Sequence, residues 1–353
     1  MTWRSPTRPG SWWRRAACSL LVAGAAAAQE LPPAALPDWR AEPHESARPA
    51  LRASCAAISA LPPDAPLGGT SVAADWAEFC AAIATPRPLR DIMERLLVVQ
   101  DHGEGRLTGY YEPELRGAPA PTPALPTPLH ARPPTPISAS RAQIQDGALA
   151  GRGLELAWVD PVDAFFLHIQ GSGRVVMPDG RVLRLGYAGA NGHPYVPIGR
   201  ILIQRGAIAR EAMSMQAIRA WLAAARPEEA RALLRANPSY IFFQELALAP
   251  DQGPIGTLGV PLTPRHSIAV DRAHVPLGAP VFVLGETGLP RLMVAQDTGG
   301  AIRGRARGDA FWGWGDAAGE AAGPQNQPIR MFVLLPPAAI RAAPGTPLAG
   351  TGP

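Results

Sequence analysis

The sequence contains no lysine, so arginine supplies every permanently charged basic side chain and no phosphate-binding P-loop can be completed. It also lacks the G-x-S-x-G motif of many serine hydrolases, and its seven histidines show no metal-ligand spacing. These absences leave no sequence support for a bound nucleotide, a metal or another cofactor.

Charged residues are also scarce, at 18% of the 353 residues, whereas 47% are hydrophobic. That balance excludes a disordered chain and predicts a real core in one large or two medium domains. The 36 glycines and 41 prolines predict many turns, loops and short strands rather than a helical bundle.

Residues 1–28 are typical of a signal peptide. A basic segment comes first, with Arg4, Arg8, Arg14 and Arg15. The apolar run Ala16–Ala25 follows, too short for the roughly 20 residues that span a bilayer, and Ala26–Ala28 offers a small-residue cleavage site. Cys18 is poorly placed for lipidation, because Arg15 occupies an apolar position of a lipobox and the apolar run follows the cysteine.

Removal of the leader changes the charge of the chain. The full sequence carries a formal net charge of +4, and the arginines of the leader account for it because the leader has no acidic residue. The mature chain is therefore close to neutral and has no broad basic field that would attract nucleic acid.

Cleavage of the leader also removes Cys18 and leaves Cys55 and Cys80. Export makes a disulfide between them chemically feasible, and both lie in segments with a helix-like pattern. A crosslink across a helix pair would stabilise the fold by about 3 kcal/mol for a loop of this size. The alternative is two buried free thiols.

The first half of the mature chain predicts helices and then strands. Residues 29–45 are rich in proline and alanine and predict a loose lead-in, whereas residues 46–100 follow a largely helical pattern. Arg106–Pro113 predicts a strand, and the proline-dense segment 117–136 predicts irregular surface chain at the start of a second domain. Further strands are predicted at Leu154–Val159, at Asp163–Gln170 and in a hairpin over Val175–Leu185.

In the second half of the chain the spacing of the apolar residues changes twice, first to a helical and then to a strand-like pattern. Helices are predicted at Ile201–Arg205, Ser214–Ala225 and Glu228–Ala236. Short strands between glycine and proline turns are predicted at Ile268–Val270, Pro280–Leu284, Leu292–Ala295 and Arg330–Leu335. Strands of this length and spacing favour a small closed barrel, and the tail from Pro336 is expected to be disordered.

Three aspartates, Asp271, Asp297 and Asp309, stand at the ends of short strand-like segments. If they converge on one barrel face, their mutual repulsion would raise the pKa of one carboxyl, which glycosidic cleavage requires near neutral pH. Taken singly, each aspartate is more readily explained as a turn or cap residue. The paired Gly299–Gly300 favours a binding site, since glycine lets the backbone approach a ligand, and Gly308 is expected to bend the chain at Asp309.

Other segments combine aromatic rings with amides and small residues, a surface suited to sugars. The candidate substrate-binding residues are Thr108, Gly109, Tyr110, Tyr111, Gln170, Gly171, Ser172, Tyr187, Asn191, Gly299 and Gly300. Aromatic core packing and plain β-turns explain the aromatic and glycine-containing segments about equally well when each is taken alone.

With these residues in view, the sequence resembles the membrane-bound lytic murein transglycosylase A family from about Leu107 to Leu335. The resemblance rests on Leu107–Pro113, Ile169–Gly173, Tyr187–His193, Ser214–Ile218 and Asn237–Phe243, followed by the aspartate region. The aspartate region is itself similar to the three-aspartate (3D) domain that the family shares with other cell-wall proteins.

The resemblance implies a mostly β fold with helices. In that fold a second β-barrel domain is inserted into a double-psi β-barrel, and the substrate groove lies between them. The implied boundaries are a signal peptide at 1–28, a discontinuous catalytic domain at 29–112 and 243–340, an inserted domain at 113–242 and a disordered tail at 341–353.

The resemblance also implies an exo-acting lyase. It would cleave the β-1,4 bond between N-acetylmuramic acid (MurNAc) and N-acetylglucosamine (GlcNAc) in peptidoglycan and leave 1,6-anhydro-MurNAc ends. Asp309 matches the catalytic residue of the family, with Asp297 and Asp271 as supporting members. The alternatives are an inverting peptidoglycan hydrolase and a non-catalytic glycan-binding protein.

The implied partners are peptidoglycan glycan strands and other proteins of cell-wall remodelling. The implied location is the periplasm after cleavage of the leader. Family members are often outer-membrane lipoproteins, so the poor lipobox leaves membrane association open.

Overall fold

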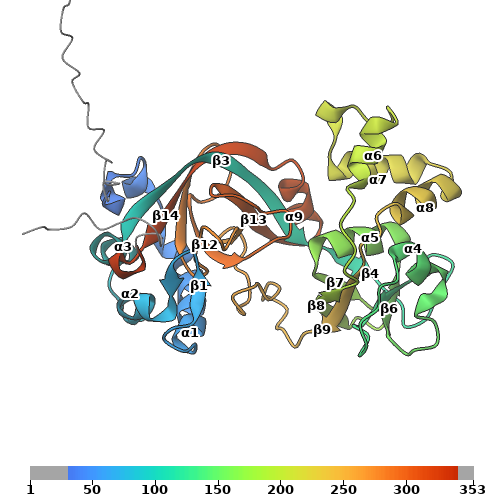
Figure 1. The fold of residues 1–353 in the computed structure, drawn as a ribbon, viewed down its shortest axis with the longest axis horizontal. Coiled ribbons are helices and arrows are strands. Elements are labelled where there is room, and N and C mark those ends of the chain that lie inside the picture. Colours follow the sequence, from blue (N-terminus) through green and yellow to red (C-terminus); the bar gives the residue numbers. More distant parts are fainter. Residues whose placement is uncertain (1–30, 341–353) are drawn as a thin grey trace, which may run out of the picture. The chain divides into compact units, whose positions relative to one another are not determined.

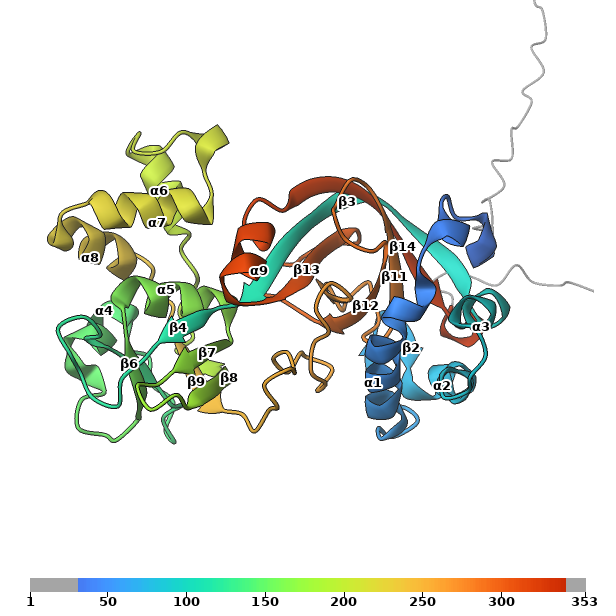
Figure 2. The same cartoon turned by 180° about the vertical axis from the view of Figure 1, so that it is seen from behind.

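The computed structural model describes residues 31–340. The predicted signal peptide, residues 1–28, and the predicted tail, residues 341–353, lie outside the described residues. Within the described part, strands form a closed barrel and smaller sheets, and helices accompany them (Figure 1; Figure 2 gives the reverse view). The expected mostly β fold with helices is confirmed.

A closed barrel carries most of the hydrophobic core. Its strands, in order around the barrel, are β10 (Ser267–Val270), β12 (Leu292–Asp297), β11 (Pro280–Leu284), β14 (Asn326–Leu335), β3 (Val98–Glu112) and β13 (Arg307–Trp314). The strands β10, β11 and β12 are continuous apolar runs because both of their faces are covered, one by the barrel interior and one by helices. The small barrel predicted from the short strands is confirmed.

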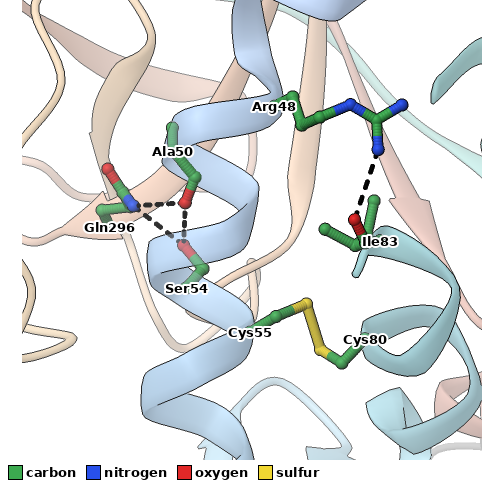
Figure 3. The surroundings of a disulfide bond; sticks show 7 residues. All are labelled: Arg48, Ala50, Ser54, Cys55, Cys80, Ile83 and Gln296. Carbon is green, nitrogen blue, oxygen red and sulfur yellow. Dashed lines mark hydrogen bonds between the residues drawn. A yellow bond between two sulfur atoms is a disulfide. The ribbon is translucent and has the colours of Figure 1, made fainter. Parts of the chain in front are cut away.

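Three helices contribute side chains to the barrel core: α1 (Arg48–Ser59), α2 (Ala77–Ile83) and α3 (Leu89–Leu96). A disulfide joins Cys55 on α1 to Cys80 on α2, and the Cα atoms of the two cysteines are 5.1 Å apart (Figure 3). The crosslink removes conformational freedom from the unfolded chain and holds the first two helices together.

Helix α1 also fixes the end of β12 through Gln296. The Nε2 atom of Gln296 donates to Ala50 O at 2.9 Å and to Ser54 Oγ at 2.8 Å (Figure 3). Its Oε1 atom accepts from Ser267 Oγ at 2.5 Å, on the neighbouring strand. Because Gln296 is fully buried and all of these groups are paired, the residue that precedes Asp297 has little freedom to move.

The N-terminal part is more ordered than the sequence suggests. Trp39, within the predicted loose lead-in, is 1% exposed and packs in the barrel core. The helix predicted through residue 100 ends at Leu96, because the β-branched pair Val98–Val99 begins β3. The remaining short elements here are 3-10 turns at Pro33–Ala35, Trp39–Ala41, His44–Ala47 and Ala73–Trp76, and the strands β1 (Pro66–Gly68) and β2 (Ser71–Val72).

Between β3 and β10 the chain forms two further sheets. One has the order β4 (Glu114–Arg116), β7 (Gly173–Val176), β8 (Val182–Ala190) and β9 (Ile241–Glu245), and the other pairs β5 (Thr127–His130) with β6 (Glu155–Val159). The helical elements here are α4 (Arg141–Gln143), α5 (Pro161–Gln170), α6 (Ile198–Gln204), α7 (Met215–Ala224), α8 (Pro227–Arg235) and the turns Ile144–Ala148 and Arg210–Ala212. The hairpin and the three helices predicted after Gly199 are confirmed.

The strand predicted at Asp163–Gln170 is wrong, because this segment is the larger part of α5. Asp160 caps the helix by accepting two backbone N–H groups of the first turn, and Pro161 stands at the first helical position. The aromatic residues that suggested a strand, Phe165 and Phe166, are buried in a cluster with α6, α7 and α8. Their burial, rather than strand geometry, explains the apolar run.

Two further expectations need correction. The proline-dense segment 117–136 is not irregular throughout, since β5 forms within it and Leu129 is fully buried. The tail is not disordered from Pro336, because a 3-10 turn at Pro337–Ala339 buries Ala339. A short helix that the sequence did not reveal, α9 (Gly315–Ala322), follows β13.

A buried ion-pair network marks the end of β3. Glu112 is 1% exposed and accepts hydrogen bonds from Arg174 Nε at 2.9 Å and from Arg184 Nη2 at 3.2 Å. Both arginines also donate to backbone carbonyls in residues 249–252. The ring of Trp314 lies 4.1 Å from the Arg174 guanidinium. The network therefore ties the end of β3 to β7 and β8.

Candidate active site

Two of the predicted aspartates lie on either side of one strand. β10 pairs in parallel with β12 and antiparallel with β13, and Ala269 is the register partner of both Asp297 and Asp309. Asp297 ends β12, whereas Asp309 lies inside β13 and not at a strand end as its sequence pattern suggested. The barrel thus brings the two carboxylates to the same level of β10.

Asp309 has the properties of a general acid. Its Oδ1 atom accepts a 2.5 Å hydrogen bond from Thr108 Oγ1, its register partner on β3. Burial raises the pKa of Asp309 to about 6, opposed by the Thr108 hydrogen bond and the charge of Arg307 and reinforced by the charge of Asp297. At a pH near 6 this carboxyl is therefore about half protonated, whereas an ordinary aspartate would be ionised.

Asp297 is held by three hydrogen-bond donors. Its Oδ2 atom accepts from Tyr110 Oη at 2.9 Å, and its Oδ1 atom accepts from Thr257 N at 3.0 Å and Thr257 Oγ1 at 2.9 Å. Burial raises the pKa of Tyr110 well above its ordinary value, and the charge of Asp297 adds to the rise, so the phenol keeps its proton and donates. These contacts fix Asp297 as a charged neighbour of Asp309.

Asp271 has a different role from the other two aspartates. It accepts from Gly304 N at 2.8 Å and from Ala273 N at 3.1 Å, and chiefly the Gly304 bond lowers its pKa. The charges that shift the pKa of Asp309 are those of Arg307 and Asp297, so the expected mutual repulsion of three carboxylates reduces to one pair. Burial contributes more than that pair does. Asp271 instead holds the loop that leads into β13.

The glycines around the aspartates serve two purposes. A Cβ atom at Gly308 would lie 2.6 Å from Ile268 Cδ1, so close packing inside the barrel, and not a bend at Asp309, favours glycine there. A Cβ at Gly109 would likewise lie 2.6 Å from Trp312 Nε1. Gly300 has open space where a Cβ would point, and Gly299 meets only Ile302, which leaves the backbone between the aspartates accessible.

The predicted sugar-binding residues outside the barrel differ in exposure. Tyr187 is 57% exposed, and Ser172 is partly exposed beside Gly171, which ends α5 in the left-handed conformation with φ 81°. The loop follows a helix, not a strand as its sequence suggested. Gln170 accepts from the backbone N–H of Tyr111 at 3.4 Å, which links this loop to the end of β3.

Two predicted binding residues have their side chains in structural positions. Asn191 is 5% exposed, and its amide bonds to the carbonyls of Ala139 and Pro238 and to the N–H of Tyr240. The side-chain amide of Asn191 is therefore fully used within the chain and is not left for a sugar. Tyr111 is also buried, and it packs against α9.

Sequence reasoning missed two residues of the site. Arg307 Nη2 donates to Thr108 Oγ1 at 2.7 Å, and it stands two residues before Asp309 on the same strand. Alternation along a strand puts such residues on one face, so this signal was available. Thr257, which holds Asp297, lies 40 positions away in an irregular segment, and no local pattern indicates it.

The fold and the site together define a barrel protein in which an aspartate of raised pKa and a hydrogen-bonded second aspartate flank one strand, an arrangement suited to acid/base chemistry. Residues 31–340 contain no group of three or more His, Cys, Asp or Glu side chains arranged for a metal ion. In the same residues, no helix combines the length and apolar character needed to cross a membrane.

Comparison with protein families identifies two matching regions. The MltA specific insert domain matches residues 106–244, and the 3D domain matches residues 266–335. A membrane-bound lytic murein transglycosylase A from Vibrio cholerae is 37% identical over 234 residues, which cover 63% of this chain. The match spans 62% of the length of that relative, less than two thirds.

Solved structures show the same relationship over more of the chain. The membrane-bound lytic murein transglycosylase from Agrobacterium tumefaciens is 34% identical with a TM-score of 0.77, covering 88% of this chain and 98% of that one. Escherichia coli MltA with bound chitohexaose is 33% identical with a TM-score of 0.65, covering 74% and 83%. The chain belongs to the membrane-bound lytic murein transglycosylase A family, as its motifs predicted.

Proposed function

We propose that this chain is an exported lytic transglycosylase that cleaves the β-1,4 MurNAc–GlcNAc bond of peptidoglycan and forms 1,6-anhydro-MurNAc ends. The observation that carries the proposal is Asp309, a half-buried carboxyl whose pKa is raised to about 6 at the centre of the barrel site. Its family supports the substrate, since the relatives are named murein transglycosylases. Exo action on the glycan chain is part of the proposal.

In the first step, protonated Asp309 donates its proton to the oxygen that links C1 of MurNAc to GlcNAc. The C1–O bond breaks, the GlcNAc-bearing strand leaves with a hydroxyl, and positive charge develops at C1. The raised pKa of Asp309 supplies the proton near neutral pH.

In the second step, the C6 hydroxyl of the same MurNAc attacks C1, and the ionised Asp309 takes its proton. The new O6–C1 bond closes the anhydro ring, and Asp309 returns to its protonated form without consuming water. One acid/base residue suffices because the nucleophile belongs to the substrate, whereas an inverting hydrolase needs a second carboxylate to activate water.

Asp297 and Asp271 are poorly suited to act as that second base. Both oxygens of Asp297 already accept hydrogen bonds, and Asp271 accepts from two backbone N–H groups. We assign Asp297 to positioning and to raising the pKa of Asp309, and Asp271 to holding the loop before β13. Thr108 orients the Asp309 carboxyl, and Arg307 orients Thr108.

For the glycan we propose a groove between a double-psi catalytic barrel and the inserted domain at residues 113–242. The solved E. coli relative with bound chitohexaose supports a β-1,4-linked sugar chain as the ligand class. The proposed contacts are the backbone of Gly299 and Gly300, the Gln170–Ser172 loop and the exposed ring of Tyr187. Tyr110, Tyr111 and Gly109 would shape the floor beneath them.

We further propose that the chain works in the periplasm after removal of residues 1–28, in association with the outer membrane or free of it. The sequence pattern of the leader supports export. The membrane-bound names of the relatives support an envelope location.

Mass spectrometry of the products from purified sacculi tests this function. A transglycosylase gives fragments whose masses sum to that of the substrate, with anhydro-MurNAc ends. An inverting hydrolase adds one water for each cut, and a glycan-binding protein without turnover releases no soluble fragments. Either of the latter outcomes would reject the proposal.

A further inference from the structure

Four arginines line a shallow cavity of about 430 Å³ at one end of β3 and β13. They are Arg106 on β3, Arg303 and Arg305 in the preceding loop, and Arg307 on β13. Glu104 is the only acidic residue that lines this cavity, which we call the arginine cleft. Its formal charge is therefore strongly positive, although the mature chain as a whole is close to neutral.

The hydrogen bonds of these arginines go to neutral groups, although the charge of Arg307 acts on Asp309 and that of Arg303 on Asp271. Arg106 donates to Asn326, Arg303 to backbone carbonyls of its own loop, and Arg305 to the carbonyl of Asp101. None of the four forms an ion pair with a carboxylate of residues 31–340. Elsewhere in these residues some arginines form ion pairs, such as Arg174 and Arg330, and others form none. The gathering of four guanidinium groups around one cavity, with a single acidic residue in its lining, favours an anion as the ligand of the cleft.

The arginine cleft lies next to Asp309 along β13, although Asp309 and Thr108 do not line the cavity itself. Arg307 and Asp309 are two residues apart on β13 and share one face, as Arg106 and Thr108 do on β3. Two strand residues span about 7 Å, and a hydrogen-bond chain runs from Arg307 through Thr108 to Asp309. An anionic group attached to the substrate within a few bonds of the reacting sugar would reach the arginines.

We propose that the arginine cleft binds the carboxylates of the peptide stem on the MurNAc unit whose bond is cleaved, an inference that rests on the proposed function. The stem begins at the lactyl group of MurNAc, and each further residue extends its reach by up to about 3.6 Å. Guanidinium groups bind carboxylates through paired hydrogen bonds. The cleft would thus distinguish stem-bearing glycan from stripped glycan at the catalytic centre.

An anionic membrane surface is the competing occupant. It would have to lie against the strands that carry Thr108 and Asp309, and a sheet of lipid there would block the glycan from the acid. A flexible stem that belongs to the substrate has no such conflict. The placement of the cleft beside Asp309 therefore favours the stem.

The test compares kcat/KM on stem-bearing glycan strands with kcat/KM on strands whose stems have been removed by an amidase. Arg303 and Arg305 are exposed, so we choose the double variant Arg303→Gln/Arg305→Gln, with thermal denaturation as the folding check. The matched control is Arg52→Gln/Arg95→Gln, which removes the same charge from exposed positions on α1 and α3. Arg106→Gln repeats the test at the arginine that β3 contributes to the cleft.

We expect the wild type to prefer stem-bearing strands and the Arg303/Arg305 variant to lose roughly tenfold of that preference, as two exposed charge contacts permit. Added salt should reduce the preference of the wild type, and the control variant should keep it. An unchanged preference in both cleft variants would overturn the inference.

Two other outcomes are distinguishable. If the cleft variant keeps its stem preference but no longer sediments with vesicles of anionic phospholipid, the cleft is a membrane site and the inference is wrong. If the wild type cleaves neither kind of strand, the proposed function fails and the inference fails with it.

Discussion

Two carboxyl groups, one on strand β3 and one on the neighbouring strand β13, have opposite surroundings. Glu112 at the end of β3 is 1% exposed, and two guanidinium groups lie within 3.2 Å of its oxygens. Asp309, beside Thr108, is only half-buried, and its close partner is a neutral hydroxyl. The first carboxylate is compensated, whereas the second is desolvated with little compensation.

The difference shows that the groups bonded to a carboxyl, and not its burial alone, decide whether its ionised or its neutral form is stabilised. Glu112 forms ion pairs with an arginine on β7 and one on β8, so its role is structural and it connects β3 to these two strands. Burial without an ion pair favours the neutral form, so the pKa of Asp309 rises to about 6. Removing the charge should therefore have opposite consequences at the two positions.

The largest expected effect is the loss of turnover in Asp309→Asn. The variant cannot donate or accept the proton, so muropeptide release from sacculi should fall by at least about 10³-fold while circular dichroism stays unchanged. Asp251→Asn, an exposed aspartate, serves as the control. Release at the wild-type rate by Asp309→Asn would show that another residue carries the proton.

The next largest effect is expected on stability when the ion pairs of Glu112 are removed. Glu112→Gln leaves Arg174 and Arg184 buried without a counter-charge and should lower the free energy of unfolding by about 3–5 kcal/mol. Urea denaturation followed by fluorescence measures it. Glu114→Gln, an exposed neighbour, should change stability very little. Equal stability of the two variants would mean that the network contributes no more than surface charge.

The two carboxyl environments also differ in how far the sequence predicts them. Apolar runs that end near Asp271 and Asp297 reveal the strands β10 and β12, because strands covered on both faces are continuously hydrophobic. The position of Asp309 inside β13 was missed, since its flanking glycine, Gly308, resembles a turn but is a strand residue packed closely against Ile268.

Contacts between distant segments escape sequence reasoning. Glu112 meets arginines 62 and 72 positions away, and no local pattern pairs them. At α5 a local signal was present, since Asp160–Pro161 is a typical helix start. The run of aromatic residues after it was nevertheless interpreted as a strand. The arginine cleft was also missed: three of its arginines form the local run Arg303–Arg307, but nothing in the sequence places Arg106 of β3 beside them.

A smaller effect is expected on the stability of Asp309→Asn. The folded-state pKa of Asp309 lies above its unfolded value, so its contribution to stability is complete below about pH 4 and is lost as pH rises through 6. Above pH 6 the variant should be more stable than the wild type by roughly 1 kcal/mol, because the half-buried group is partly solvated. Melting temperatures from pH 4 to 8 measure the difference. A destabilised variant at pH 8 would contradict the expected sign.

The smallest effect is expected from Thr108→Val. The Thr108 hydrogen bond lowers the pKa of Asp309, so its loss should raise that pKa further and move the alkaline limb of the kcat/KM profile upward by less than about one pH unit. Thr108→Ser keeps the hydroxyl and should keep the wild-type limb. A downward shift in Thr108→Val would mean that the hydroxyl does not stabilise the ionised form.

The central claim is that the pKa of Asp309 is raised to about 6, so that part of this carboxyl still carries its proton as the pH approaches neutral. Carbon-13 NMR titration of the aspartate carboxyl groups, with Asp309 assigned by the resonance missing from Asp309→Asn, tests it most directly. The account predicts a pKa of about 6 for Asp309, and a lowered pKa for Asp271. A titration of Asp309 at or below the ordinary aspartate value would contradict it.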